Sequence, residues 1–574
     1  MIYDWKNQIK LLTGFAGSWG LAFVTQQTAL LFVDSRYYIA AQQQLKDPWQ
    51  MVKASDLKHS IAEELLKYME PGTNIGINPF RFSKGAIEKF SKVFQLQNIN
   101  FTLCTDDLLV EASQDSGHKE LYNEIEIFEM DTVSCGEKCI KIGQAMRSKN
   151  ADLLILSALD DIGYLLNLRG TDLDSTPFFY SYALVSCIKD HDDDDYKVKV
   201  KLYCQLNKLP EGIEDHFLKQ SASVSLHSYD EFLIDLKKDL VDITGYVWAS
   251  SGVNFGISDS LKDHKLIETA NPVCLMKSLK SDQEISNAHI AHHEEAISFF
   301  EFMHWLETNY KTVNITELSA SDKLAEIKTN RPVKSADKRH RSLSFETIFS
   351  VGKNAADIHH TPDANAIVTG KEIVLVDFGS QYLYGTTDTT RTFHLETPTA
   401  EEVHHFTLVL KGFIAVAITK PKCESNLNYL EGIARHHLNM ENLDFAHSLG
   451  HGVGNYGCVH EDPIVTGRIY EETQLMRIKP KMFFSNEPGC YIEGRHGIRI
   501  ENVVCTYPDK NNHLKLVDLT KIPIQRKMID TSLLGQQEKD YLNSMNRDIR
   551  SEFEYLKDFL PHAYEYMMRN TESF

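Results

Sequence analysis

The chain has 574 residues, more than a single hydrophobic core supports, so we expect several domains. Its hydrophobic content of 42% and charged content of 24% are ordinary for a globular protein. The formal net charge of −20 argues against a nucleic-acid partner, and no apolar run approaches the roughly 20 residues that a membrane span needs.

The predicted elements divide the chain into four parts, 1–130, 131–270, 271–525 and 526–574. The first part mixes short strands and helices, and the second begins with a helix over 135–150 and continues with strands. The third part shows helix, helix and hairpin twice over, with leading helices at 281–310 and 399–420. This order indicates an internal duplication. The last part is amphipathic and helical, and we expect it to pack on the third part or at a dimer contact.

Residues 372–394, EIVLVDFGSQYLYGTTDTTRTFH, predict the first hairpin. EIVLV is apolar and β-branched, as expected for a buried strand, and TTDTTRTFH is a second strand candidate. With a loop over Gln381 to Tyr384, the register sets Asp377 opposite Asp388. Because opposed residues share one face of a sheet, these two carboxylates are expected to project together.

A second hairpin is predicted over residues 482–504, MFFSNEPGCYIEGRHGIRIENVV. A loop around Glu493 to Arg495 would set Glu487 opposite Glu501. Like charges opposed on a strand pair are destabilising, and burying unpaired carboxylates costs several kcal/mol each. Two such pairs therefore point to bound cations.

The histidine of the motif HSLGHGVG, His451, lies between the two hairpins in the sequence. Oxygen donors with one imidazole favour Mn²⁺, with Zn²⁺, Co²⁺ or Fe²⁺ as alternatives. Two divalent metal ions can activate water and stabilise both sides of a hydrolytic displacement. The sequence therefore predicts a dinuclear metallohydrolase.

These motifs resemble the signature of the X-prolyl aminopeptidases (aminopeptidase P) of the cytosolic, three-domain type. The matching segments are VDFGSQYLYGTTDTTRT, HSLGHGVG, VHEDP and NEPGCYIEGRHGIRIENVV, and the similarity covers nearly the whole chain. It implies an α/β (α+β) fold in which 271–525 form a pita-bread catalytic domain. Two creatinase-like α/β domains, 1–130 and 131–270, would precede this domain, and a helical extension, 526–574, would follow it.

The resemblance also implies a role for each candidate ligand. Asp377 would chelate one metal ion, and Asp388 and Glu501 would bridge the two. His451 and Glu487 would hold the other ion. Glu487 would also be the general base that takes a proton from the attacking water, since a carboxylate beside that water is within proton-transfer reach.

Further residues are expected to surround the metal ions and the substrate. The family's substrate-orienting and catalytic histidines match three residues here, His359, His447 and His460. Arg499 precedes Glu501 by two residues and shares its strand face, where it is either a residue that orients that carboxylate or an ordinary exposed strand arginine. Arg36 matches an arginine that reaches the substrate from the N-terminal domain of the family. We interpret His360 and His496, which adjoin motif positions, as bystanders.

The implied reaction is removal of the N-terminal residue from a peptide whose second residue is proline. The start, MIYDWKNQIKLL, lacks a secretory signal, and the ten cysteines have no disulfide or zinc spacing, so we expect a cytoplasmic protein. We also expect a homodimer without nucleic-acid or membrane partners. Relative to the family, the chain begins late, and we expect the first strand and helix of the N-terminal domain to be missing.

Two other functions remain open. An X-Pro dipeptidase (prolidase) shares the five ligands and the fold, although the long three-domain chain and the wording GTTDTTRT favour the aminopeptidase. A non-catalytic pita-bread protein that binds partners is the second alternative. Such proteins normally lose metal ligands, whereas all five candidates are present here.

Overall fold

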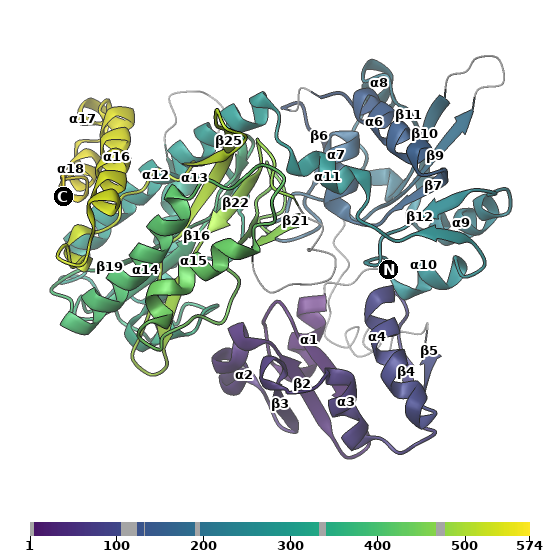
Figure 1. The fold of residues 1–574 in the computed structure, drawn as a ribbon, viewed down its shortest axis with the longest axis horizontal. Helices are drawn as coiled ribbons and strands as arrows, with labels where there is room; N and C mark the ends of the chain where they lie inside the picture. The colour runs from purple at the N-terminus through teal and green to yellow at the C-terminus, as the bar shows by residue number, and fades with distance from the viewer. Residues whose placement is uncertain (1–4, 105–122, 131–132, 190–195, 332–339, 467–476) are drawn as a thin grey trace. The chain divides into compact units, whose positions relative to one another are not determined.

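Figure 1 shows the computed structural model of the chain, which describes residues 5–104, 123–130, 133–189, 196–331, 340–466 and 477–574. The chain divides into two compact units. The first comprises Met1–Leu173 and Phe178–Met276, and the second comprises Asp174–Pro177 and Lys277–Phe574. Among the described residues, no helix is long and apolar enough to cross a membrane.

The first part of unit one contains two small sheets. The strand β2 is the centre of a three-stranded sheet, antiparallel to β1 and parallel to β3, and each of its residues is buried, as expected for an apolar central strand. The strands β4 and β5 pair in parallel. The elements are α1 (Trp5–Thr13), β1 (Leu21–Val24), β2 (Ala29–Val33), α2 (Tyr38–Gln44), β3 (Trp49–Lys53), α3 (Ile61–Leu65), β4 (Asn74–Ile77), α4 (Lys84–Phe94) and β5 (Asn100–Leu103).

The second part of unit one is built on a six-stranded sheet of order β11-β10-β9-β7-β12-β13. Its first helix, α6, confirms the helix predicted over 135–150. The strands β9 and β10 form an antiparallel hairpin whose acidic tip, 190–195, lies outside the described residues. The elements are β6 (Ile125–Ile127), α6 (Cys135–Ser148), β7 (Ala151–Leu156), α7 (Leu159–Leu166), β8 (Leu168–Gly170), β9 (Tyr182–Lys189), β10 (Tyr196–Cys204), α8 (Ile213–Lys219), β11 (Ser223–Ser228), α9 (Phe232–Leu240), β12 (Tyr246–Trp248), α10 (Phe255–Ser260) and β13 (Lys265–Ile267).

Two helix pairs organise unit two. The helices are α12 (Asp282–Asn309), α13 (Glu317–Asn330), α14 (Ala400–Ile418) and α15 (Asn428–Asn439). Reciprocal capping boxes begin the two long helices, Ser281 with Glu284 for α12 and Thr399 with Glu402 for α14. The two predicted helix pairs are confirmed by these four helices. In Figure 1, α14 and α15 run side by side across the strands.

A set of strands follows each helix pair. The first set is centred on the sheet β15-β16-β19, and the second forms the sheet β21-β20-β22-β25-β26. The two sets meet where the Glu501 amide donates to the Thr390 carbonyl at 3.2 Å. The strands are β14 (His340–Leu343), β15 (Ile348–Val351), β16 (Ile373–Phe378), β17 (Ser380–Tyr382), β18 (Gly385–Thr386), β19 (Thr389–His394), β20 (Gly450–Gly452), β21 (Glu461–Thr466), β22 (Phe483–Asn486), β23 (Gly489–Ile492), β24 (His496–Arg499), β25 (Asn502–Pro508) and β26 (Leu514–Asp518). This duplicated arrangement is the predicted pita-bread fold.

The chain ends in three helices, α16 (Gln536–Phe553), α17 (Leu556–Phe559) and α18 (Pro561–Asn570). Several of their apolar residues, among them Leu542, Phe553 and Met567, are fully buried in the same core as residues of α12 and α14. The amphipathic extension therefore packs on the rest of unit two, which is one of the two placements predicted for it.

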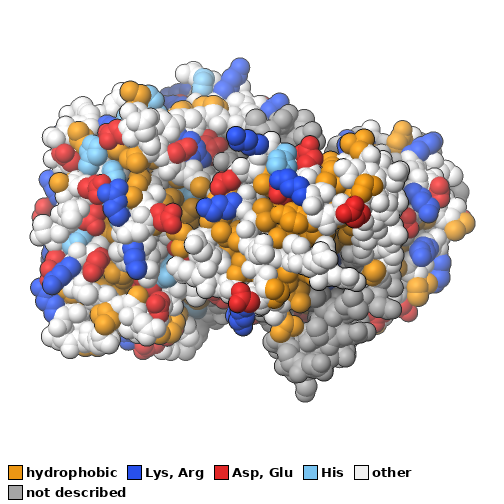
Figure 2. Space-filling model, turned by 90° about the horizontal axis from the view of Figure 1, so that it is seen from below, with side chains coloured by type: hydrophobic (Ala, Val, Ile, Leu, Met, Phe, Trp, Pro, Cys, Tyr) orange, Lys and Arg blue, Asp and Glu red, His pale blue; other side chains and the backbone are white. Residues whose placement is uncertain are grey.

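On the face shown in Figure 2, acidic and basic side chains of the described residues are interspersed. Mixed single charges of this kind are typical of a solvated surface. Among the described residues of unit two, in contrast, several carboxylates are buried, among them Asp377, Asp388 and Glu501.

Candidate metal centre

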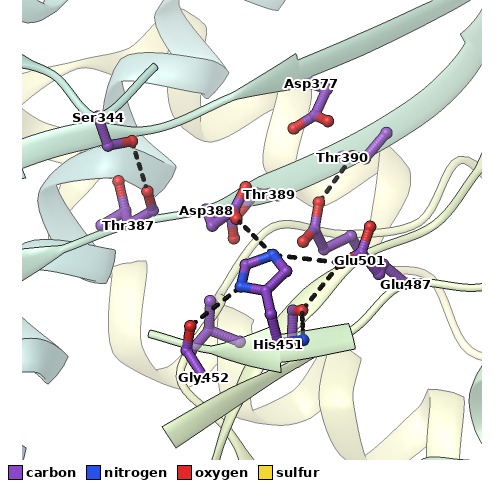
Figure 3. Close-up of polar contacts among 12 residues, drawn as sticks. Ser344, Asp377, Thr387, Asp388, Thr389, Thr390, His451, Gly452, Glu487 and Glu501 are labelled. Carbon is purple, nitrogen blue, oxygen red and sulfur yellow. Dashed lines mark hydrogen bonds and ion pairs between the residues drawn. The ribbon is translucent and has the colours of Figure 1, made fainter. Parts of the chain in front are cut away.

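Five predicted ligands converge at the place where the two strand sets of unit two meet (Figure 3). The ligand atoms of Asp388, His451 and Glu501 lie within 4.8 Å of one another. The Nε2 atom of His451 lies 3.4 Å from Asp388 Oδ2 and 3.2 Å from Glu487 Oε1. Asp377 lies on β16, which pairs with β19, the strand that follows Asp388. The charge of Asp377 acts on Asp388. The five segments thus bring four carboxylates and one imidazole together.

The predicted register of the first hairpin is wrong by two residues. Asp377 pairs with Thr390 rather than Asp388, and Tyr382 pairs with Gly385, so the connection has two residues instead of four. Gly385, which follows the turn, is closely packed: an added Cβ would meet Asn455 Oδ1 at 3.1 Å and the Cα of Ala288 on α12 at 3.3 Å. Since side chains alternate faces, a two-residue shift keeps Asp377 and Asp388 on one face as diagonal neighbours.

The second hairpin has the predicted register. Ile492 pairs with His496 across the expected loop, in which Gly494 has a φ of +75°. The pairs on either side of Glu487 and Glu501 keep one common register, which places these two carboxylates opposite each other.

The buried carboxylates perturb one another. Burial, reinforced by the neighbouring carboxylates, raises the pKa of Asp388 and of Glu501 well above its usual range. Burial would also raise the pKa of Glu487, but the hydrogen bond and charge of His451 lower it to about 2. Burial would lower the pKa of His451, yet its contacts with Glu487 and Asp388 raise it to about 9. One imidazole therefore compensates only part of the negative charge.

The unused donor atoms fit divalent cations. One oxygen of Asp377 accepts a hydrogen bond, whereas its Oδ1 is buried and has no hydrogen-bond partner among the described residues. One oxygen of Glu501 is held by Thr390 at 2.7 Å, and one oxygen of Glu487 by Ser485 at 3.0 Å. Carboxylates held at one oxygen present the other to a metal ion, and this oxygen-rich donor set with one imidazole suits hard divalent cations.

Arg499 crosses between the two hairpins and is fully buried. Its Nη2 donates to Asp377 Oδ2 at 2.6 Å, and its Nε donates to Thr390 Oγ1 at 3.0 Å. The Thr390 hydroxyl in turn donates to Glu501. Arg499 therefore orients Asp377 directly and Glu501, its predicted partner, only through Thr390. Sequence reasoning missed Thr390 because its role depends on the true strand register.

His447 is held by a tyrosine that sequence reasoning also missed. Arg499 Nη1 donates to the Tyr491 hydroxyl at 2.8 Å, so that hydroxyl donates to His447 Nε2, also at 2.8 Å. The Nδ1–H of His447 then donates to the Ser448 carbonyl at 2.8 Å. Burial lowers the pKa of His447 to about 4, so its ring is neutral. Tyr491 follows Glu487 by four residues along the hairpin, and this even spacing was the sequence signal that could have indicated a place beside the site.

The remaining predicted residues lie at different places. The His460 ring makes an edge-to-face contact with His451, with centroids 4.0 Å apart. His359 is half-buried and directly follows Ile358, whose carbonyl accepts from Arg499 at 3.5 Å. Arg36 belongs to unit one, where its guanidinium forms two hydrogen bonds with Asp34. The roles assigned to these three residues stay predictions.

His360 and His496 have partners of their own. His496 Nε2 lies 2.9 Å from His405 Nδ1. His360 Nε2 contacts Glu317 at 2.7 Å, and Glu317 is fully buried at the start of α13. Burial opposes protonation of His360, but hydrogen bonds and charges of Asp357 and Glu317 raise its pKa to about 9. His360 is therefore a structural cation.

A His360→Gln variant should be less stable, and the deficit should depend on pH. A pKa raised from 6.5 to about 9 gives a stabilisation that is complete below pH 6.5 and lost as the pH rises through 9. The free energy of unfolding should fall by about 2–3 kcal/mol at pH 6 and by much less at pH 9.5. Urea unfolding at both pH values measures this, with His513→Gln as the control. An equal deficit at the two pH values would contradict the ion pair.

Comparison with known proteins agrees with this geometry. The metallopeptidase family M24 matches residues 284–507, and the C-terminal region of that peptidase family matches 512–574. The creatinase/prolidase N-terminal domain matches twice, over 6–108 and 123–284. Xaa-Pro aminopeptidase 1 of Dictyostelium discoideum is 31% identical over 560 residues, covering 94% of this chain and 86% of the relative. The chain belongs to the Xaa-Pro aminopeptidase family.

Solved structures of this and related families share the fold. The X-prolyl aminopeptidase of Caenorhabditis elegans, a cytosolic enzyme with a di-nuclear active site, matches with a TM-score of 0.91 at 27% identity, covering 100% of this chain and 93% of that chain. The Xaa-Pro dipeptidase of Bacillus anthracis has a TM-score of 0.52 at 20% identity and covers 68% of this chain and 99% of its own. Members of the Xaa-Pro aminopeptidase family thus match this chain over nearly its full length.

Proposed function

We propose that the chain is a metalloaminopeptidase that hydrolyses the first bond of peptides whose second residue is proline. The observation that carries this proposal is the convergence of Asp388, His451 and Glu501, whose ligand atoms lie within 4.8 Å of one another. Asp377 and Glu487 complete the donor set. Asp377, Asp388 and Glu501 would hold one cation, and Asp388, Glu501, His451 and Glu487 would hold the other.

Bound divalent cations would polarise the scissile carbonyl and lower the pKa of the attacking water. Glu487 is the proton acceptor in this proposal, because a carboxylate beside the attacking water is within proton-transfer reach. Ser485 donates to its Oε1 at 3.0 Å and so fixes the orientation of this carboxylate. Glu487 then returns that proton to the leaving nitrogen.

A proline at the second position restricts how this site can bind the peptide. A proline nitrogen within a peptide has no hydrogen to donate, so a peptidase cannot hold that bond through an N–H contact. We assign substrate contacts to His359, His447 and His460. His447 is neutral and its Nε2 accepts from Tyr491, so its contribution in this state passes through the tyrosine hydroxyl.

The donor set further supports Mn²⁺ as the native metal, with Zn²⁺ or Co²⁺ as alternatives, because carboxylates outnumber the single imidazole. Elemental analysis of the protein purified without added metal tests the identity of the metal. A homodimer and a cytoplasmic location remain predictions from the sequence.

The purified protein with Mn²⁺ is expected to release arginine from Arg-Pro-Pro, which mass spectrometry detects as free arginine and the dipeptide Pro-Pro. Prior treatment with a chelator should abolish the release, and Mn²⁺ should restore it. A dipeptidase would leave the tripeptide intact and cleave only Arg-Pro. If neither peptide is cut and no metal is bound, the protein is a binding module instead.

A further inference from the structure

Arg391 on β19 is a buried cation with an unusual set of partners. It is 3% exposed, and it uses all five guanidinium N–H groups on uncharged acceptors. The acceptors are the carbonyls of Thr390 (2.9 Å), Glu501 (2.7 Å), Ile522 (2.6 Å) and Pro523 (3.3 Å) and the side-chain oxygen of Asn502 (2.7 Å). Arg391 thus binds the main chain of Glu501, and its neighbour Thr390 binds the carboxylate of that residue.

The contacts continue from Arg391 to the C-terminal helices. The Asn502 amide accepts from Arg391 through Oδ1 and donates through Nδ2 to Asp518 Oδ1 at 2.9 Å, so only one orientation of the amide satisfies both partners. The other oxygen of Asp518 accepts from the Tyr541 hydroxyl at 2.6 Å. Tyr541 lies on α16, so four side chains connect that helix to Glu501.

Charge also links the two ends of this chain of contacts. Burial lowers the pKa of Arg391 to about 10, and Asp518 is the strongest of the charges that oppose this effect. The cation and its carboxylate are separated by the Asn502 amide, which polarises toward both. Removing any member leaves a buried polar group unpaired, and the adjacent group must then move or take up water.

We propose that Arg391, Asn502, Asp518 and Tyr541 form a positioning relay through which helix α16 sets the place of Glu501 in the metal centre. The proposal rests on the proposed dinuclear function. It assigns these four residues a role in metal affinity although none of them is a candidate ligand. Groups that orient metal ligands commonly change metal affinity by 10–100-fold when they are replaced.

Two variants and one control test the relay. Tyr541→Phe removes only the hydroxyl, and we expect the Mn²⁺ dissociation constant to rise about 3–10-fold. Arg391→Lys keeps the charge but loses the planar fork, and we expect a rise of about 10–100-fold. Tyr564→Phe is the matched control, because this hydroxyl donates to exposed Glu554 on the same extension, away from the relay. Isothermal titration of chelator-treated protein with Mn²⁺ measures all three.

A merely structural role would lower the melting temperature of the variants without changing Mn²⁺ affinity, and that result would overturn the relay. We also expect kcat to fall at saturating Mn²⁺ while KM for Arg-Pro-Pro stays unchanged, since no relay residue touches the peptide. If Arg391→Lys does not fold, the Tyr541→Phe titration decides alone. Wild-type protein that binds no Mn²⁺ would instead refute the proposed function, so the two failures are distinguishable.

Discussion

Glu487→Gln is expected to reduce Arg-Pro-Pro cleavage by about 10²–10⁴-fold while the fold is retained. Glutamine has nearly the same shape, but it cannot accept the proton of the attacking water and return it to the proline nitrogen. The Ser485 hydroxyl can still donate to the amide oxygen at the position that Glu487 Oε1 occupies, so the hairpin keeps its geometry. Rates from mass spectrometry, with circular dichroism on the same samples, provide the test.

The matched control is Glu493→Gln, which makes the same change at the exposed tip of the same hairpin. It should leave the rate within about twofold of the wild type, because surface substitutions of this kind have little effect. Substantial cleavage by Glu487→Gln at saturating Mn²⁺ would rule out Glu487 as the proton acceptor.

Asp388→Asn should have opposite effects on the metal-free and the metal-loaded protein. In the metal-free protein, Asp388 is buried beside other carboxylates, which raises its pKa. A raised pKa means that the contribution of this group to stability is complete below pH 4 and is lost as the pH rises through the folded-state value. The variant without metal should therefore be more stable than the wild type by about 1–2 kcal/mol at pH 8 and no more stable near pH 4.

With Mn²⁺ the order of stability should reverse. A ligand at 100 times its dissociation constant adds about 2.7 kcal/mol to the stability of the protein that binds it. Asp388→Asn loses a bridging carboxylate and should gain little from added metal. Differential scanning calorimetry with and without Mn²⁺ measures both effects, and Asp558→Asn, at an exposed position of α17, controls for the charge change. Equal Mn²⁺ stabilisation of variant and wild type would contradict the bridging role.

Local sequence patterns predicted the ligands of the candidate site and one of its two hairpin registers. Asp377, Asp388, His451, Glu487 and Glu501 were found because each lies in a short segment whose residues are contiguous in the chain. The register of the second hairpin was predictable, since its Gly-containing loop of three residues follows ordinary turn chemistry. The first hairpin turns at Leu383 and Tyr384, which carry no such signal, so its two-residue connection could not be predicted from the local sequence.

The residues around the ligands were harder to predict. Thr390 follows Asp388 by two residues, but its hydroxyl becomes a partner of Glu501 only because β19 lies against the second hairpin. Tyr491 likewise acquires a role from the approach of His447, 44 residues earlier. Contacts between distant segments depend on the packing of the whole unit, and no local pattern encodes them.

The amino-acid sequence by itself determined the helices, the duplicated order and the five ligand candidates of this protein, because alternation, capping and turn chemistry act over a few residues. The tertiary structure alone decided the strand register at Asp377, the route from Arg499 to Glu501, and the path from Tyr541 through Asp518 to Arg391. These depend on which side chains meet when two halves and a C-terminal extension bury a common core, since hydrophobic packing is non-directional and is satisfied only by the fold as a whole.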